Sequence, residues 1–172
     1  MLSIVLSLWV GGESVLMPSL FAGSQRAVLT MFLPVPLVVA TALALDSHVP
    51  ALETSAVRPV SRFDVALVLA TLAPALVLAM AADSGVLICV LRNAAFLTGL
   101  FLLTRPLAGQ ASVMTPVGWI AVVVFFSSRP WPDPDPWTVL PEPAGALHAA
   151  VAAIASLTAG VLVHLHLSRG DR

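Results

Sequence analysis

The chain has 172 residues, of which 59% are hydrophobic and only 10% are charged, and its formal net charge is −1. Soluble domains carry about 25% charged residues, so this composition excludes an ordinary water-soluble enzyme, and the absence of a basic excess argues against nucleic-acid binding. The single cysteine, Cys89, excludes a disulfide framework. The composition therefore predicts an all-α integral membrane protein.

Apolar runs of nearly membrane-spanning length follow one another along the chain. A bilayer core about 30 Å thick needs about 20 apolar residues per helix. The predicted helices of this single transmembrane domain, 1–172, cover about 2–22, 27–45, 63–82, 85–104, 112–128 and 144–167. The first run is interrupted by Gly11, Gly12 and Glu13. Its alternative is a cleaved signal peptide, although no basic segment precedes it.

The arginines set the expected orientation of these six helices. If the N-terminus is cytoplasmic, two arginines lie outside, Arg26 and Arg129, and five lie inside. The five are Arg58, Arg62, Arg105, Arg169 and Arg172. Because positive charge concentrates on the cytoplasmic side, both termini are expected in the cytoplasm.

Two connections are long enough to carry structure. The cytoplasmic one, 46–62, has room for one or two helical turns between Pro50 and Pro59. The external one, 129–143, has too many prolines for a continuous helix. It is either a stiff linker or a short interfacial or re-entrant element held at headgroup level by Trp131 and Trp137.

Charges within the apolar runs are costly in hydrocarbon and are therefore informative. Glu13 lies in the first predicted helix and Arg92 in the fourth, at depths that differ by only about 3 Å at a rise of 1.5 Å per residue. We predict that these two side chains approach each other and neutralise their charges. Such a pair either holds the helices together or lines a substrate path.

The remaining polar residues do not form a catalytic or metal-binding pattern. His164 and His166 are two residues apart, so on a helix they point in different directions, and they are expected to reach toward the cytoplasmic headgroups. His148 has no second ligand at helical spacing, no Ser–His–Asp pattern is visible, and the glycines at 11 and 12 lack the Lys of an ATP site. We expect no enzyme activity, cofactor or metal. The small residues Gly99 and Gly160 are expected to allow close helix packing.

The cytoplasmic connection carries a resemblance to a known family. Leu52 and Glu53 are followed, after five residues, by Pro59-Val60-Ser61-Arg62, immediately before the third predicted helix. This resembles the membrane subunits of type 2 ATP-binding-cassette exporters, which have a Gly-Thr-Leu-Glu stretch and a Pro-Val-Ser-Arg turn between helices two and three. Pro50 and Ala51 occupy the Gly-Thr positions here.

The resemblance implies a permease subunit in a bacterial cytoplasmic membrane. It would export an amphipathic substrate, such as a peptide, a lipid or an antibiotic, with a separate ATPase subunit and a second permease copy or a related chain. The residues implied to couple to the ATPase are Leu52, Glu53, Arg58, Pro59 and Arg62. The alternative for this segment is an ordinary charged loop that only fixes orientation.

Two other functions compete with the exporter permease. One is a non-transporting accessory or immunity subunit of a larger membrane complex, which the small size of the chain would suit. The other is a carrier that needs no ATPase and is driven by protons through Glu13. A membrane enzyme ranks last, since no paired carboxylates or histidine-rich cluster face one leaflet.

Overall fold

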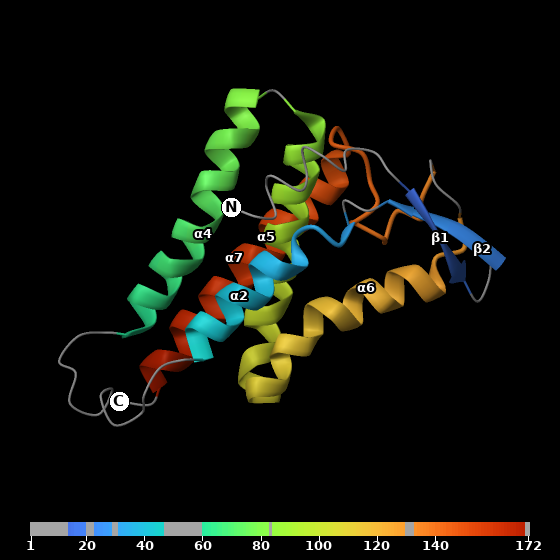
Figure 1. Ribbon diagram of the computed structural model, residues 1–172. Helices are drawn as coiled ribbons and strands as arrows, with labels where there is room; N and C mark the ends of the chain where they lie inside the picture. The colour runs from blue at the N-terminus through green and yellow to red at the C-terminus, as the bar shows by residue number, and fades with distance from the viewer. Residues whose placement is uncertain are drawn as a thin grey trace.

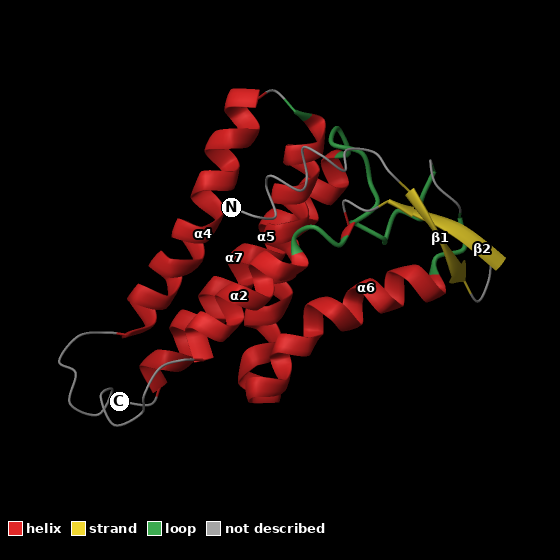
Figure 2. Ribbon diagram, in the orientation of Figure 1, coloured by secondary structure: helices red, strands yellow, loops and turns green. Residues whose placement is uncertain are grey.

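The fold is predominantly helical in the computed structural model, which describes residues 14–19, 23–28, 31–46, 60–82, 84–129 and 133–170. Near the N-terminus, two antiparallel strands, β1 (Ser14–Ser19) and β2 (Gly23–Val28), form a hairpin. The α-helices are α2 (Val35–Asp46), α4 (Val60–Ala82), α5 (Gly85–Ala108), α6 (Thr115–Phe126) and α7 (Leu147–Gly170), and the 3₁₀-helix η2 (Gly109–Met114) joins α5 to α6. Figures 1 and 2 show α4, α5 and α7 as the long helices, with α6 leading away toward the hairpin.

Three helical segments are long and apolar enough to cross a membrane: Phe63–Ala81, Gly85–Phe126 and Leu147–Leu167. The second combines α5, η2 and α6. A 23-residue helix such as α4 is about 35 Å long at 1.5 Å per residue, which exceeds the hydrocarbon thickness of about 30 Å. The predicted membrane protein is confirmed to this extent, and six crossings stay a prediction.

The first predicted helix, 2–22, is wrong where the structure describes it, since residues 14–19 form strand β1 and pair antiparallel with β2. The register joins Ser14 to Val28 and Ser19 to Gly23. Pro18 disfavours a helix here because proline lacks the N–H group that continues a helix, although α4 and α5 each accommodate one proline. In a two-stranded sheet both strands are edges, where proline is tolerated.

The second predicted helix, 27–45, is also shorter than expected, because β2 occupies its first two residues and α2 starts only at Val35. Pro34 and Pro36 lie at the start of this helix, as Pro116 does in α6, where a missing N–H costs little. By contrast, Pro74 in α4 and Pro106 in α5 lie inside helices. At 12 residues, α2 is about 18 Å long and too short to span by itself.

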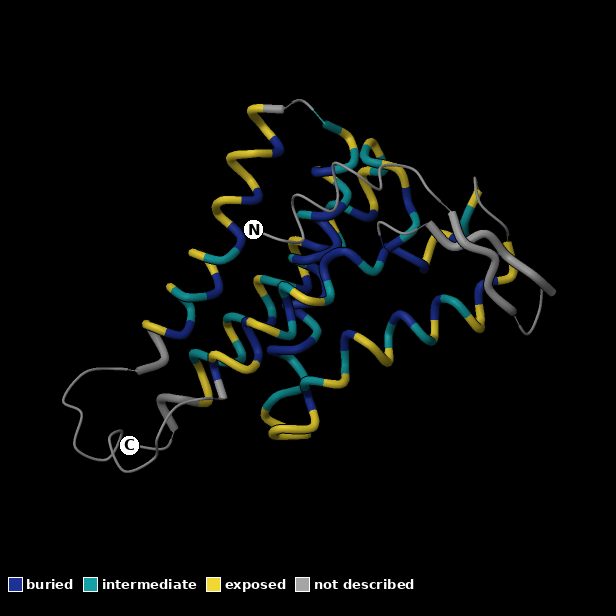
Figure 3. Tube along the Cα trace, viewed as in Figure 1, coloured by how far each residue is buried: buried dark blue, intermediate teal, exposed yellow. Residues whose placement is uncertain are grey.

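Helix α5 lies at the centre of the molecule. Its residues Phe96 and Leu97 belong to one apolar cluster with α2, α6, α7 and the loop after α6, and Phe101 and Leu102 belong to a second with α2 and α4. Figure 3 shows the resulting contrast between the buried α5 and the exposed outer side of α4. The buried share is 61% in the apolar segment Gly85–Phe126, 28% in Phe63–Ala81 of α4 and 17% in Leu147–Leu167 of α7. Helices α4 and α7 therefore present most of their apolar surface outward.

Two glycines let α5 and α7 approach each other closely, as predicted. A Cβ atom added to Gly99 would lie 2.4 Å from the backbone of Ser156, and one added to Gly160 would lie 2.7 Å from the Gly99 carbonyl oxygen. The Ser156 hydroxyl also donates a hydrogen bond to the Phe96 carbonyl, at 3.1 Å. Backbone proximity at small residues is a common way for helices to associate in lipid.

The end of α5 is tied to its neighbours by polar contacts. Gly109 ends the helix in a positive-φ conformation (φ 54°) that favours glycine. The Thr104 and Thr115 hydroxyls lie 2.8 Å apart and link α5 to α6. Arg105 donates to the carbonyl of Leu45 at the end of α2, at 3.0 Å. The ends of α2 and α5 therefore lie at the same end of the molecule.

Candidate functional site

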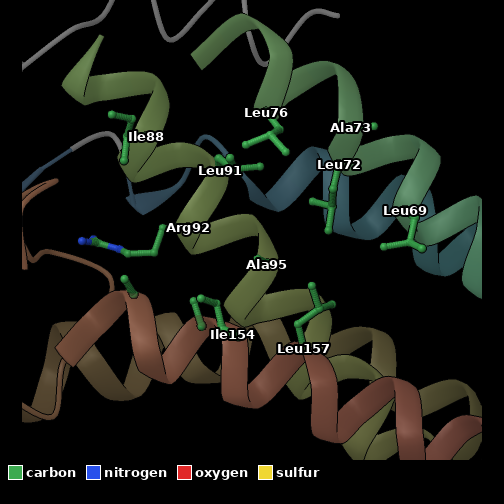
Figure 4. A pocket seen from close by; sticks show the side chains of 12 residues that line it. Leu69, Leu72, Ala73, Leu76, Ile88, Leu91, Arg92, Ala95, Ile154 and Leu157 are labelled. Carbon is green, nitrogen blue, oxygen red and sulfur yellow. The ribbon is translucent and has the colours of Figure 1, made fainter. Parts of the chain in front are cut away.

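An apolar groove runs between α4, α5 and α7. Its volume is about 580 Å³, within the range of about 300–1,000 Å³ that small-molecule sites occupy. The lining comprises Leu69, Leu72, Ala73 and Leu76 of α4, Ile88, Leu91, Arg92 and Ala95 of α5, and Ala150, Ala153, Ile154 and Leu157 of α7. Figure 4 shows the leucines of α4 facing α5 and α7 across the groove. The lining is aliphatic except for one arginine, so it suits a hydrocarbon ligand.

Arg92 lines the groove with its aliphatic stem, while its guanidinium extends away toward the loop after α6 (Figure 4). The group is buried in a set of backbone carbonyls. Its Nη1 donates to the Pro143 carbonyl at 2.8 Å, and its Nη2 donates to that of Glu142 at 2.7 Å, with the Val139 carbonyl 3.1 Å away. Carbonyl oxygens in one short loop segment thus satisfy a buried positive charge, which would otherwise be very costly.

Asn93 completes this arrangement from the next position on α5. Its Oδ1 accepts a hydrogen bond from Arg92 Nε, at 3.2 Å, and its Nδ2 donates to the Leu140 carbonyl, at 2.9 Å. Asn93 is fully buried, so its amide is bonded on both sides, as buried polar groups generally are. The Arg92–Asn93 dipeptide therefore fixes residues 139–143 onto α5.

The same loop is held by two acidic residues. The Glu142 carboxylate lies 3.2 Å from His148 Nε2 in the first turn of α7. Asp135 accepts hydrogen bonds from the Ser128 amide at 2.7 Å and the Arg129 amide at 3.2 Å. The described part of the connection 129–143 forms turns, and Thr138, Val139 and Leu140 are buried, whereas its external location stays a prediction.

The Asp135 carboxylate is stabilised in its charged form. Burial raises its pKa, but hydrogen bonds from the Ser128 amide and hydroxyl, the Arg129 amide and the Ser127 hydroxyl lower it, so that the pKa lies below its usual value. Arg129 Nε is 3.5 Å from the carboxylate as well. The loop thus depends on an ionised Asp135.

A second polar site lies beyond the opposite end of the groove, past the lining residues Leu69 and Leu157. His164 Nε2 on α7 is 3.0 Å from Asp64 Oδ2 in the first two turns of α4, and both side chains are largely buried, at 16% and 9% exposure. The interpretation of His164 as a residue that reaches toward headgroups was wrong, because its imidazole is bonded to a neighbouring helix. His166 is exposed.

The predicted functional residues have different outcomes. Leu52, Glu53, Arg58 and Pro59 lie outside the described residues, and so does Glu13, which leaves the Glu13–Arg92 pair a prediction. Arg62 belongs to the first turn of α4, which begins at Val60 rather than at 63. Arg92 occupies a loop-binding site that the sequence analysis did not anticipate.

Sequence reasoning also missed the Asp64–His164 pair. A usable signal existed, because both residues fall inside predicted spans, 63–82 and 144–167, where charged or titratable groups need partners. Among the described residues, no group of three His, Cys, Asp or Glu side chains is arranged to hold a metal ion.

Neither a protein-family model, nor a curated protein, nor a solved structure matches this chain. Its function must therefore be argued from the groove, the polar sites near its two ends and the sequence of the connection 46–62.

Proposed function

We propose that the chain is the transmembrane permease subunit of an ATP-driven exporter of an amphipathic substrate, and that it works with a separate ATPase subunit and a second permease copy or related chain. The observation that carries the proposal is the aliphatic groove between α4, α5 and α7. A peptide, lipid or antibiotic with a hydrocarbon part would place that part in the groove, where burial of apolar surface is favourable.

The position of α4 supports the proposed coupling to an ATPase. The connection that contains Leu52, Glu53 and Arg58 leads directly into α4, and α4 supplies one wall of the groove. Because most of α4 is not enclosed by other helices, a rigid-body movement of this helix would widen or narrow the groove with little repacking. Force on the connection would thereby reach the substrate.

Co-purification from host membranes in mild detergent tests the coupling segment. We expect an ATP-binding-cassette ATPase, identified by mass spectrometry, to co-purify with the wild-type chain and to be lost with Glu53→Arg and with Arg58→Glu. The control is Asp133→Arg, an equal charge reversal at an exposed loop position on the expected opposite side. If no such ATPase binds, or if the loop variants retain it, the coupling proposal is wrong.

A photoactivatable palmitoyl probe in lipid nanodiscs tests the groove. Ala73 lines it, whereas Ala70, one turn earlier on α4, is also exposed but does not line it. We expect Ala73→Trp to reduce probe labelling of the groove peptides several-fold and Ala70→Trp to leave it unchanged. Equal labelling in both variants would show that the groove is not where the hydrocarbon binds.

The arrangement around Arg92 favours a second candidate, a non-transporting accessory subunit. The guanidinium is engaged by Asn93 and by carbonyls of the chain's own loop, which is what a structural role requires. In that case the ATPase would co-purify with the chain, but the palmitoyl probe would label the Ala73→Trp and Ala70→Trp variants equally.

A further inference from the structure

The groove between α4, α5 and α7 is open along one side. Its floor is α5, on which Leu91 and Ala95 belong to the same apolar cluster as the buried Leu72 of α4, and Figure 4 shows these side chains between α4 and α7. Its rim contains side chains that line the groove and are also exposed, such as Leu76 of α4 and Ile154 of α7. Where these helices cross a membrane, the groove therefore opens sideways to the acyl chains of lipids.

The length of the groove corresponds to part of one leaflet. Each of the three helices lines it with residues at positions i, i+3, i+4 and i+7, which form one face of a helix. From Ile88 to Ala95 of α5, this face is about 10 Å long at 1.5 Å per residue. One leaflet of the hydrocarbon core is about 15 Å thick, which is half of about 30 Å. An acyl chain that lies along the groove can therefore belong to a lipid of a single leaflet.

The groove lies toward one end of the helices. Ile88 is three residues after the start of α5 at Gly85, and Ala150 is three residues after the start of α7 at Leu147. A Cβ atom added to Gly85 would lie 3.6 Å from the Cβ atom of Ala144, so the two helices begin at the same end of the molecule. The other end of the groove is about 20 Å from the end of α5 at 1.5 Å per residue. The groove therefore faces the leaflet at the end where α5 and α7 begin.

The lining disfavours ligands that need hydrogen bonds inside the groove. Among the described lining residues, only Arg92 has a side chain with a hydrogen-bonding group, and its guanidinium donates to the carbonyls of Glu142 and Pro143, at 2.7 and 2.8 Å. A peptide would bring backbone N–H and C=O groups into the groove without partners, which is unfavourable. An acyl chain has no such groups and gains free energy when its apolar surface is buried. The lining therefore favours a lipid over a peptide or a polar antibiotic.

We propose that the groove binds one acyl chain of a membrane lipid, which enters sideways from the leaflet at the end where α5 and α7 begin. The ester end of the chain lies near Ile88 and its methyl end near Leu157, while the polar headgroup stays outside the groove. This inference rests on the proposed function, because it takes the groove as the substrate site, and it names a lipid as the substrate class.

Two photoactivatable lipids test the inference with the full chain in nanodiscs. Both are phosphatidylcholines with a palmitoyl chain, which carries a diazirine next to the ester in one probe and at the methyl end in the other. Mass spectrometry locates the labelled residues. We expect the first probe to label Ile88 and Leu91 and the second to label Ala95 and Leu157. Labelling of Leu162, which is exposed on α7 and does not line the groove, reports lipid outside the groove in the same sample.

Variants distinguish a bound chain from the surrounding bilayer. Ala73→Trp should reduce labelling of Leu91 and Ala95 several-fold with both probes and leave Leu162 unchanged, whereas Ala70→Trp, at an exposed position outside the groove, should change none of them. The inference is overturned if Ala73→Trp has no effect, if both probes label the same groove residues, or if their order along the groove is reversed.

The outcomes also separate this inference from the proposed function. A reversed order together with a loss of labelling in Ala73→Trp would refute the assigned leaflet and leave the groove as a hydrocarbon site. Expected labelling without co-purification of an ATPase would support the lipid site and refute the exporter. The order of labelling is measured in the wild-type chain, so misfolding of a variant does not obscure it.

Discussion

The two ends of the groove hold their charges in different ways. At one end, Arg92 carries a charge that does not titrate in the physiological range, and its donors meet neutral carbonyls from one loop. Beyond the other end, Asp64 and His164 come from two different helices and contact each other side chain to side chain, at 3.0 Å. The comparison teaches that one site fastens a loop to a helix through backbone carbonyls, whereas the other joins two helices through a pair of side chains.

The largest expected effect comes from removing the fixed charge. Arg92→Ala should destabilise the protein by at least about 3 kcal/mol, because several buried carbonyls lose their donors at about 1–3 kcal/mol each. Thermal unfolding in detergent measures the loss, and proteolysis within 133–146 should accelerate. Arg92→Lys is expected to fall between wild type and Arg92→Ala, since one ammonium cannot span carbonyls that a guanidinium fork reaches. Wild-type stability in Arg92→Ala would refute a structural role for this end.

The crossing of α5 and α7 lies between the two ends and is expected to affect both. Gly99→Ala places a methyl group against the Ser156 backbone, and overpacking of this kind costs about 1–3 kcal/mol. Gly118→Ala is the matched control, because a Cβ atom there meets nothing within 4 Å. It should be neutral or stabilising by up to about 1 kcal/mol, the difference in helix propensity. Equal unfolding temperatures for the two variants would contradict the close crossing.

The Asp64–His164 contact should contribute less to stability than the Arg92 site. Hydrogen bonds between membrane helices contribute about 0.6 kcal/mol on average and at most about 1.7 kcal/mol, so Asp64→Asn at neutral pH should cost no more than this. Chemical unfolding in detergent, compared with Arg92→Ala, measures the difference. A loss as large as that of Arg92→Ala would remove the distinction between the two ends.

The smallest expected effect concerns the loop that Arg92 holds. The pKa of Asp135 is lowered in the folded protein, so its carboxylate stabilises the loop fully above its ordinary value of about 3.9 and loses this contribution as pH falls through the lowered pKa. Asp135→Asn should therefore destabilise the loop at neutral pH by about 1 kcal/mol. Limited proteolysis should detect this loss near pH 7, and the gap between variant and wild type should close in strong acid.

The helical membrane architecture was readable from the sequence because it depends on local composition. The runs that became α4, α5 and α7 are long and apolar, and their predicted limits differ from the observed helices by a few residues. The hairpin at 14–28 was missed because its apolar residues also fit a membrane helix. There Pro18 and the pairing of two strands outweighed hydrophobicity.

The candidate site was predictable only in part. Arg92 was recognised as important because a charge within an apolar run is conspicuous. Its partners are backbone carbonyls 47 to 51 residues further along the chain. Every residue has a backbone carbonyl, so the sequence does not indicate which ones bind Arg92. His164 was interpreted without a partner, because Asp64 is 100 residues away in the chain. The close approach at Gly99 and Gly160 was foreseen because small residues have few other reasons to recur within apolar helices.

The sequence by itself determined that this is a membrane protein and where its long helices lie, because the transfer of apolar residues from water is a property of each segment. Only the tertiary structure decided that α5 is central, that α4 leaves a groove beside it, and that Arg92 lies at one end of the groove while the Asp64–His164 contact lies beyond the other. Those features depend on contacts between residues far apart in the chain, and such contacts form only when the helices pack.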